Sequence, residues 1–140
     1  DSARFDVFDL VDAARRGDAA RSVRIKHGLG EEGVAPPLVA WALTREIRNL
    51  ARMAADVARG ASTDEVFRRH RVWDKRRAAV SAALARSAPR AWLDMLRQAA
   101  HADRAAKGGA GGRPWDALES LALAMGGVML MGGRPYNRSP

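Results

Sequence analysis

The residues best placed to do chemistry gather around one tryptophan in the middle of the chain. Trp73 is surrounded by Arg71, Lys75, Arg76 and Arg77. Guanidinium and ammonium groups bind the phosphates of DNA and the carboxylates of acidic protein surfaces. Four cations at the start of an expected helix oppose the helix dipole, which costs roughly a few tenths of a kcal/mol or more. Three interpretations stay open: a contact with DNA, a contact with an acidic partner, and a solvated helix start.

A second set of basic residues lies on one face of a long expected helix. Arg45, Arg48 and Arg52 recur at spacings of three and four, which places them on the same side. Residues 34–113 contain 16 basic and 7 acidic side chains and so carry the excess behind the net charge of +8. Such a surface attracts nucleic acid or acidic proteins, although arginine could also serve solubility alone. We treat these arginines and the cluster around Trp73 as candidates for contact with a partner subunit or with DNA.

No set of residues has the pattern of a catalytic or metal site. His27, His70 and His101 lie far apart without a second ligand at helical spacing. The chain has no cysteine, which excludes disulfides and thiolate ligands. The glycine-rich stretch 108–112 follows a helix and leads into Arg-Pro instead of Gly-Lys-Ser/Thr, so it is no phosphate-binding loop. We expect no catalytic residue, no metal and no cofactor.

The elements that must position these residues are predicted to be helices throughout. Alanine and arginine dominate the composition, and both favour helices. Apolar residues recur every three or four positions, and glycine, proline or capping residues separate the stretches. No strand is predicted, nor an apolar run of the roughly 20 residues needed to cross a bilayer. We expect an all-α bundle of six or seven helices, over residues 5–16, 18–33, 36–59, 62–69, 74–84, 89–107 and 114–126.

The apolar faces of these helices define the expected core. Tryptophan on such a face usually packs inside the protein, and among the four tryptophans Trp73 is the exception because it sits inside a basic cluster. Asp18, Ser62 with Glu65, and Asp74 are expected to cap helix starts. The core candidates are Trp41, Leu43, Ile47, Leu50, Trp92, Leu96, Trp115, Leu118 and Leu121.

Four segments, in order along residues 36–126, resemble a known family. They are Trp41-Ala-Leu-Thr-Arg-Glu-Ile-Arg48, His70-Arg-Val-Trp-Asp-Lys-Arg76, Asp103-Arg-Ala-Ala-Lys-Gly108 and Pro114-Trp-Asp-Ala-Leu-Glu-Ser-Leu121. Their order and spacing resemble the C-terminal collar domain of the delta subunit of the bacterial DNA polymerase III clamp loader. The glycine-rich stretch departs from the family pattern, which puts any side-chain contact of that loop in doubt.

The resemblance implies how the chain is organised. Residues 1–33 would be lead-in helices and residues 34–126 the core of the collar bundle. Residues 127–140 lie outside the resemblance, and we expect them to be a flexible C-terminal tail, either frayed or weakly docked. The chain begins at Asp1 without an initiator methionine, so we expect a piece of a longer subunit.

The resemblance also implies a function. A collar domain holds the subunit in the five-membered loader that places the sliding clamp on primed DNA. The implied partners are the gamma/tau and delta-prime subunits, with primer–template DNA as a secondary contact. The sliding clamp would be contacted only by the absent N-terminal domain. The domain itself would not be an enzyme, although its parent complex would resemble the DNA polymerase III holoenzyme. The resemblance further implies a location in the cytoplasm, at the nucleoid-associated replisome, and not in a membrane. The residues alone leave one alternative: an independent basic helical domain that binds nucleic acid.

Overall fold

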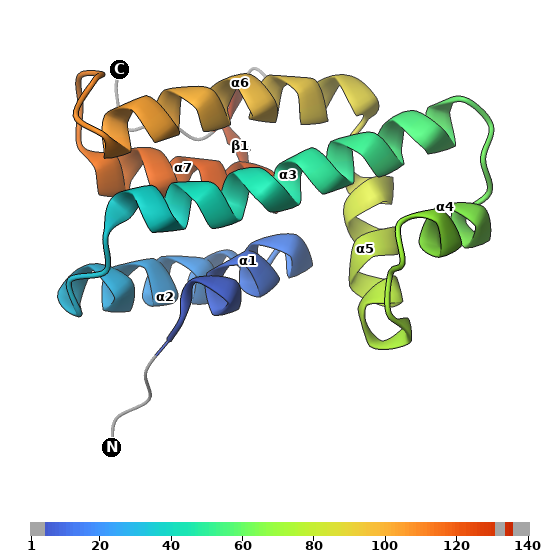
Figure 1. Ribbon diagram of the computed structural model, residues 1–140, viewed down its shortest axis with the longest axis horizontal. Helices are drawn as coiled ribbons and strands as arrows, with labels where there is room; N and C mark the ends of the chain where they lie inside the picture. Colours follow the sequence, from blue (N-terminus) through green and yellow to red (C-terminus); the bar gives the residue numbers. More distant parts are fainter. Residues whose placement is uncertain (1–4, 131–133, 136–140) are drawn as a thin grey trace.

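The computed structural model of the chain describes residues 5–130 and 134–135. These residues form an all-α bundle, as predicted, with a minimal pair of strands near the C-terminus (Figure 1). The helices are α1 (Val7–Arg16), α2 (Ala19–Glu31), α3 (Pro36–Ala58), α4 (Thr63–Arg69), α5 (Asp74–Arg86), α6 (Pro89–Ala106) and α7 (Pro114–Met125). The strands β1 (Met129–Leu130) and β2 (Arg134–Pro135) pair in antiparallel fashion, which the sequence analysis did not predict.

Helix α3 is the centre of the bundle. It packs against α6 and α7 on one side and against α1 on the other (Figure 1). Helix α2 pairs with α1 and also contacts α7, so the first two helices share the core of the later ones. Helix α5 runs across the end of the bundle and contacts α1 and α3. None of the described helices is long and apolar enough to cross a membrane.

Local sequence signals explain where the helices begin. Asp18 caps α2 by accepting a hydrogen bond from the Arg21 amide. Ser62 and Glu65 form the expected capping box, in which each side chain accepts a hydrogen bond from the other residue's backbone amide. Proline stands in the first turn of α3, α6 and α7, where its missing amide hydrogen costs nothing.

Most of the expected core residues lie inside the bundle. Those with no exposed surface are Leu43, Ile47, Leu50, Trp92, Leu118 and Leu121. Leu96 and Trp115 are partly buried and pack against the same cluster. Trp115 lies beside Gly30 of α2, where even a methyl group would meet the indole at van der Waals distance. The core is therefore continuous from α2 through α3 to α7.

The expectation for Trp41 is wrong, because half of this side chain is exposed. Trp41 precedes Arg45 by four positions and Arg48 by seven, so the helical period places it on the arginine face of α3 and not on the buried one. Val57, which lies at helical spacing from the buried Leu50 and Ala54, is also exposed. It lies near the C-terminal end of α3, which extends past α6 (Figure 1).

The expected flexible tail, residues 127–140, lies largely outside the described residues. Gly126 ends α7, and the Gly127 amide donates a hydrogen bond to the Ala124 carbonyl. Strand β2 returns the chain to the side of α7. The segment around the strands is thus folded back toward the bundle where it is described.

Candidate functional site

The junction between α4 and α5 presents Trp73 to solvent. His70 caps the C-terminal end of α4, and Arg71 follows with a φ of 54°, in the left-handed region that glycine usually occupies. The Val72 amide reaches back to the Phe67 carbonyl at 2.9 Å, closing a Schellman turn. This turn buries Val72 and leaves 66% of Trp73 exposed.

Helix α5 starts directly after this tryptophan. Trp73 is the N-cap residue and makes no side-chain capping bond. Asp74, expected to be the cap, is instead the first residue of the helix, because the chain enters extended at Trp73. The first turn of α5 therefore holds one carboxylate among three cations.

The cations around Trp73 have two different roles. The Lys75 ammonium and the Arg76 guanidinium lie 5.9 Å and 5.8 Å from the centre of the indole ring. Arg77 turns toward the protein: its Nε donates a hydrogen bond to the Val72 carbonyl at 3.2 Å, and its guanidinium lies 5.4 Å from the Phe67 ring. Arg77 therefore stabilises the turn, whereas Lys75 and Arg76 remain at the surface.

A shallow, open cleft of about 690 Å³ lies beside Trp73. We call it the Trp73 cleft. Its floor is apolar and its rim is basic. It is lined by Phe67, Arg68, Arg71, Val72, Trp73, Asp74, Lys75 and Arg77.

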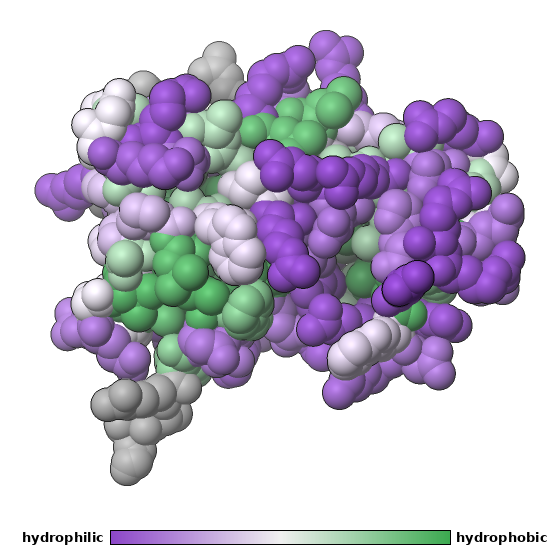
Figure 2. Space-filling view, in the orientation of Figure 1, coloured by the Kyte–Doolittle hydropathy of each residue, from purple (hydrophilic) through white to green (hydrophobic). Residues whose placement is uncertain are grey.

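A second exposed aromatic surface lies at the other end of α3. The Trp41 ring meets the Phe8 ring of α1 edge-on at 6.4 Å, and the Arg45 guanidinium lies 5.7 Å from the Trp41 ring. Leu38, one turn before Trp41, is 48% exposed. Figure 2 shows an apolar area over α1 and the start of α3. We call Phe8, Leu38, Trp41 and Arg45 the Trp41 surface.

The arginines of α3 extend from this surface. Arg45, Arg48 and Arg52 are all exposed, and within residues 5–130 none of them forms an ion pair. The structure shows no direct contact between them and the cluster around Trp73. The candidate residues thus form two groups, one along α3 and one at the α4–α5 junction.

Comparison with known proteins identifies the family of the chain. The family model described as the C-terminal part of the processivity clamp loader gamma complex of DNA polymerase III matches residues 7–131. The chain belongs to this clamp-loader family. It is 30% identical over 128 residues to DNA polymerase III subunit delta of Escherichia coli, covering 89% of this chain and 36% of that protein. It is 27% identical over 130 residues to the same subunit of Haemophilus influenzae, covering 87% of this chain and 38% of that protein.

The resemblance to the delta C-terminal domain is therefore confirmed. The chain spans little more than a third of the length of these relatives. Two of the four segments that carried the resemblance contain the exposed tryptophans, Trp41 and Trp73. Within the described residues of this clamp-loader domain, no group of three histidine or acidic side chains could hold a metal ion.

Sequence reasoning missed a partly buried polar cluster next to the α4–α5 junction. The Asp56 carboxylate of α3 lies 2.7 Å from His70 Nε2, 3.3 Å from Arg69 and 3.2 Å from Arg59. The hydrogen bond from His70, aided by Arg69, holds the pKa of the Asp56 carboxyl below its ordinary value of 3.8. Asp56 and His70 are fourteen positions apart on different helices, so no helical spacing could have paired them. The cluster fixes the end of α4 on α3 and thereby positions Arg71 and Trp73.

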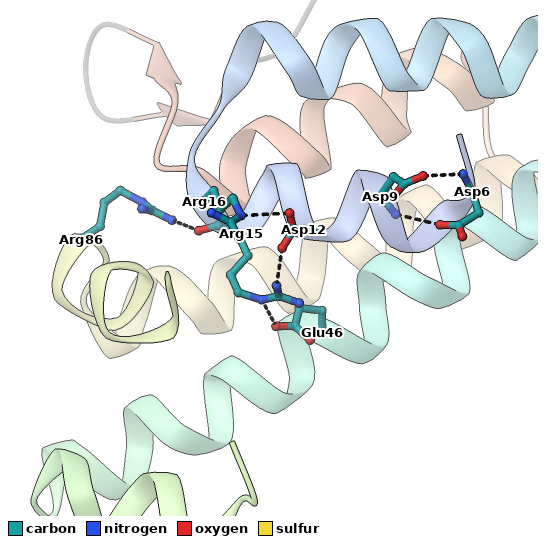
Figure 3. A network of polar contacts seen from close by, with 7 residues as sticks. All are labelled: Asp6, Asp9, Asp12, Arg15, Arg16, Glu46 and Arg86. Atoms are coloured by element: carbon teal, nitrogen blue, oxygen red, sulfur yellow. Dashed lines mark hydrogen bonds and ion pairs between the residues drawn. The ribbon is translucent and has the colours of Figure 1, made fainter. Parts of the chain in front are cut away.

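A second missed network fixes the first helix of the clamp-loader domain (Figure 3). The buried Arg15 of α1 donates a hydrogen bond to Glu46 of α3 at 2.8 Å and pairs with Asp12 at 3.1 Å. Arg86, at the end of α5, donates hydrogen bonds to the carbonyls of Arg15 and Met125 at 3.0 Å and 3.1 Å. These carbonyls belong to the last turns of α1 and α7, which lack partners inside their helices. Arg86 therefore joins three helices at one point.

Proposed function

We propose that this domain is the collar of a delta-type clamp-loader subunit, the part that holds the subunit in the five-membered loader. Its partners would be the gamma/tau and delta-prime subunits, and the assembled loader would place the sliding clamp on primed DNA. The observation that carries the proposal is an exposed aromatic surface on a member of a clamp-loader family.

The Trp41 surface has the chemistry of a protein interface. A tryptophan and a phenylalanine in edge-to-face contact lie beside an exposed leucine, with a guanidinium at the rim. Tryptophan and arginine are enriched among the residues that dominate binding energies, and apolar neighbours around them exclude water. Adjacent apolar side chains exposed together are uncommon on a protein that works alone. A neighbouring collar helix would cover them, and carboxylates on that helix would meet Arg48 and Arg52.

The proposal assigns no catalysis to this domain. Primer–template DNA would be a secondary contact through the basic residues of α3 and α5. Contact with the sliding clamp would belong to the part of the subunit that lies outside this chain. The parent complex would act with the DNA polymerase III holoenzyme.

Co-purification tests the proposal. The full-length subunit that contains this chain is mixed with the gamma/tau and delta-prime subunits of the same organism and separated by size. We expect a stable complex, which Trp41→Ala weakens and Trp73→Ala, a change at the other exposed tryptophan, leaves intact. Absence of any association with either partner would refute the collar function.

The alternative, an independent nucleic-acid-binding domain, predicts a different result. It requires tight DNA binding by the isolated chain with a steep salt dependence. It also requires that loss of the Trp41 surface has no effect on any subunit contact.

A further inference from the structure

We infer that α4 and α5, with the turn between them, open from the bundle as one unit while the other helices stay folded. We call residues 62–86 the α4–α5 arm. Such opening lies beyond the proposed function, because it belongs to one domain and needs no partner. It would let the Trp73 cleft, which lies on the arm, move without loss of the Trp41 surface, which belongs to α1 and α3.

The arm shares little apolar surface with the bundle. Its two helices bury only a few side chains, which are Val66, Phe67, Val80 and Ala83. Helix α4 packs on α3, and α5 packs on α1 and α3 at the end of the bundle (Figure 1). Helices α3 and α6 instead share a core that includes the fully buried Trp92. Segments with few buried apolar contacts open at a lower free energy than the whole domain.

Polar contacts fasten the arm to the bundle at the end of each of its helices. At the end of α4, His70 Nε2 and Arg69 lie 2.7 Å and 3.3 Å from the Asp56 carboxylate of α3. At the end of α5, Arg86 donates hydrogen bonds at 3.0 Å and 3.1 Å to carbonyls of α1 and α7. Arg69 and Arg86 also keep exposed surface, so water can solvate both guanidinium groups when the arm opens. The net cost of breaking a hydrogen bond is small when water replaces the partner.

Arg77 joins the two helices of the arm. Its Nε donates a hydrogen bond to the Val72 carbonyl of the turn, and its guanidinium lies 5.4 Å from the Phe67 ring of α4. Within the part of the chain that the structure describes, α4 and α5 share little other contact. We therefore expect the two helices to open together for as long as Arg77 is in place.

The connections at the two ends of the arm permit this movement. Gly60, between α3 and α4, has a φ of 104°, and a Cβ added there would meet no atom within 4 Å. Ser87 and Ala88, between α5 and α6, are both extended, as the residue before Pro89 is expected to be. Helices α3 and α6 pack against each other. Rotation within these two short connections would move the arm without separating α3 from α6.

Hydrogen exchange tests the opening in the full-length subunit that contains this chain, with mass spectrometry of peptides to locate the exchanging amides. We expect the amides of α4 and α5 to exchange at least about 10-fold faster than the slowest amides of α3 and α6, because short helices lose their hydrogen bonds once detached. In low concentrations of urea, the exchange rates of α4 and α5 should rise with one common slope. That slope should be smaller than the slope for α3 and α6, because opening the arm exposes less surface than unfolding the domain.

Two variants separate opening of the arm from unfolding of the domain. Arg86→Gln removes the fastening of α5 and should speed exchange in the arm by about 10-fold, the effect of losing a hydrogen bond from a charged group. Lys26→Gln is the matched control, because Lys26 of α2 pairs with Glu119 of α7 at 2.9 Å, outside the arm. It should speed the slowest amides of α3 and α6 by about 5-fold. It should leave the arm unchanged, because this ion pair is still present when only the arm is open.

Arg77→Gln tests whether the arm is one unit. With Arg77 in place, Arg86→Gln should speed the exchange of α4 as well as that of α5, although the hydrogen-bond partners of Arg86 lie on α1 and α7. When Arg77→Gln is also present, Arg86→Gln should still speed the exchange of α5, but α4 should no longer respond.

Three results would overturn the inference. One is exchange of the arm as slow as that of α3 and α6. Another is an equal effect of Lys26→Gln on the arm and on α3 and α6, which would mean that the domain opens only as a whole. The third is a response of α5 without α4 to Arg86→Gln while Arg77 is in place, which would make the helices two separate segments. Failure of the subunit to join sister subunits would refute the collar function but would not change these exchange rates.

Discussion

Replacing Trp41 and Trp92 by alanine should separate an interface residue from a core residue. The two tryptophans belong to neighbouring helices, α3 and α6, but Trp92 has no exposed surface and Trp41 is half-exposed. A half-buried tryptophan removes roughly 100 Å² from water, which is worth at most about 2.5 kcal/mol. Alanine retains part of that burial, so we expect Trp41→Ala to lower the free energy of unfolding by about 1–2 kcal/mol. Trp92→Ala should lower it by about 3–5 kcal/mol, because it also leaves a cavity.

Two measurements on the same variants check these values. Urea denaturation followed by circular dichroism gives the free energy of unfolding. Size-exclusion chromatography with the sister subunits gives the affinity of assembly. Trp41→Ala should weaken this affinity by about 2–4 kcal/mol, or about 30- to 1000-fold. Trp73→Ala is the control and should change neither the stability by more than about 1 kcal/mol nor the assembly.

Two outcomes would contradict this reasoning. If Trp41→Ala destabilises the domain as much as Trp92→Ala does, then Trp41 is a core residue and the Trp41 surface is not available to a partner. If Trp41→Ala has the expected small effect on stability but assembles normally, then the partner binds another face.

The remaining predictions concern the α4–α5 junction. Because the pKa of the Asp56 carboxyl is lowered in the folded state, its stabilising contribution is present above about pH 4 and declines as the pH falls below its ordinary value of 3.8. Urea melts of the unchanged chain and of Asp56→Asn should therefore differ most near neutral pH and converge in acid, and a constant difference would argue against the linkage. Arg71→Gly should raise the free energy of unfolding by about 0.5–1 kcal/mol by relieving the left-handed strain, and a loss of stability in thermal melts would mean that the arginine side chain contributes more than its backbone costs. Arg76→Glu should leave the free energy of unfolding unchanged, whereas Arg77→Glu should lower it by about 1–2 kcal/mol because it removes the hydrogen bond to the Val72 carbonyl. Equal melting curves for the two variants would refute the different roles of these arginines.

The helices were predictable because their signals are local. Proline in the first turn, the Ser62–Glu65 capping box and apolar residues at helical spacing each concern only a few neighbouring positions. The misplaced Trp41 could have been found in the same way, since its spacing to Arg45 and Arg48 places it on the arginine face. Its residue type suggested the core, and the spacing was the better guide.

The contacts that position the site could not be predicted from the sequence. Asp56 with His70, and Arg15 with Glu46, are pairs whose partners lie on different helices, and their meeting depends on how the helices pack. The left-handed Arg71 was equally hidden, because the usual signal for that conformation is a glycine. The charged neighbours of Trp73 indicated that it lies at the surface. They could not show that the left-handed turn at Arg71 is what exposes it.

The hydrogen bonds of Arg86 fix the C-terminal end of α5 to two other helices. The first turn of α5 lines the Trp73 cleft. Arg86, about 20 Å further along the helix, donates hydrogen bonds to the ends of α1 and α7. Gly127 lies against the Arg86 side chain, and a Cβ added at Gly127 would come within 2.8 Å of it. The Arg86 side chain is therefore closely packed at this position. Helix α1 also carries Phe8 of the Trp41 surface. The hydrogen bonds of Arg86 therefore connect the helix that starts after Trp73 to the helix that carries Phe8, so the two exposed aromatic surfaces share one structural connection.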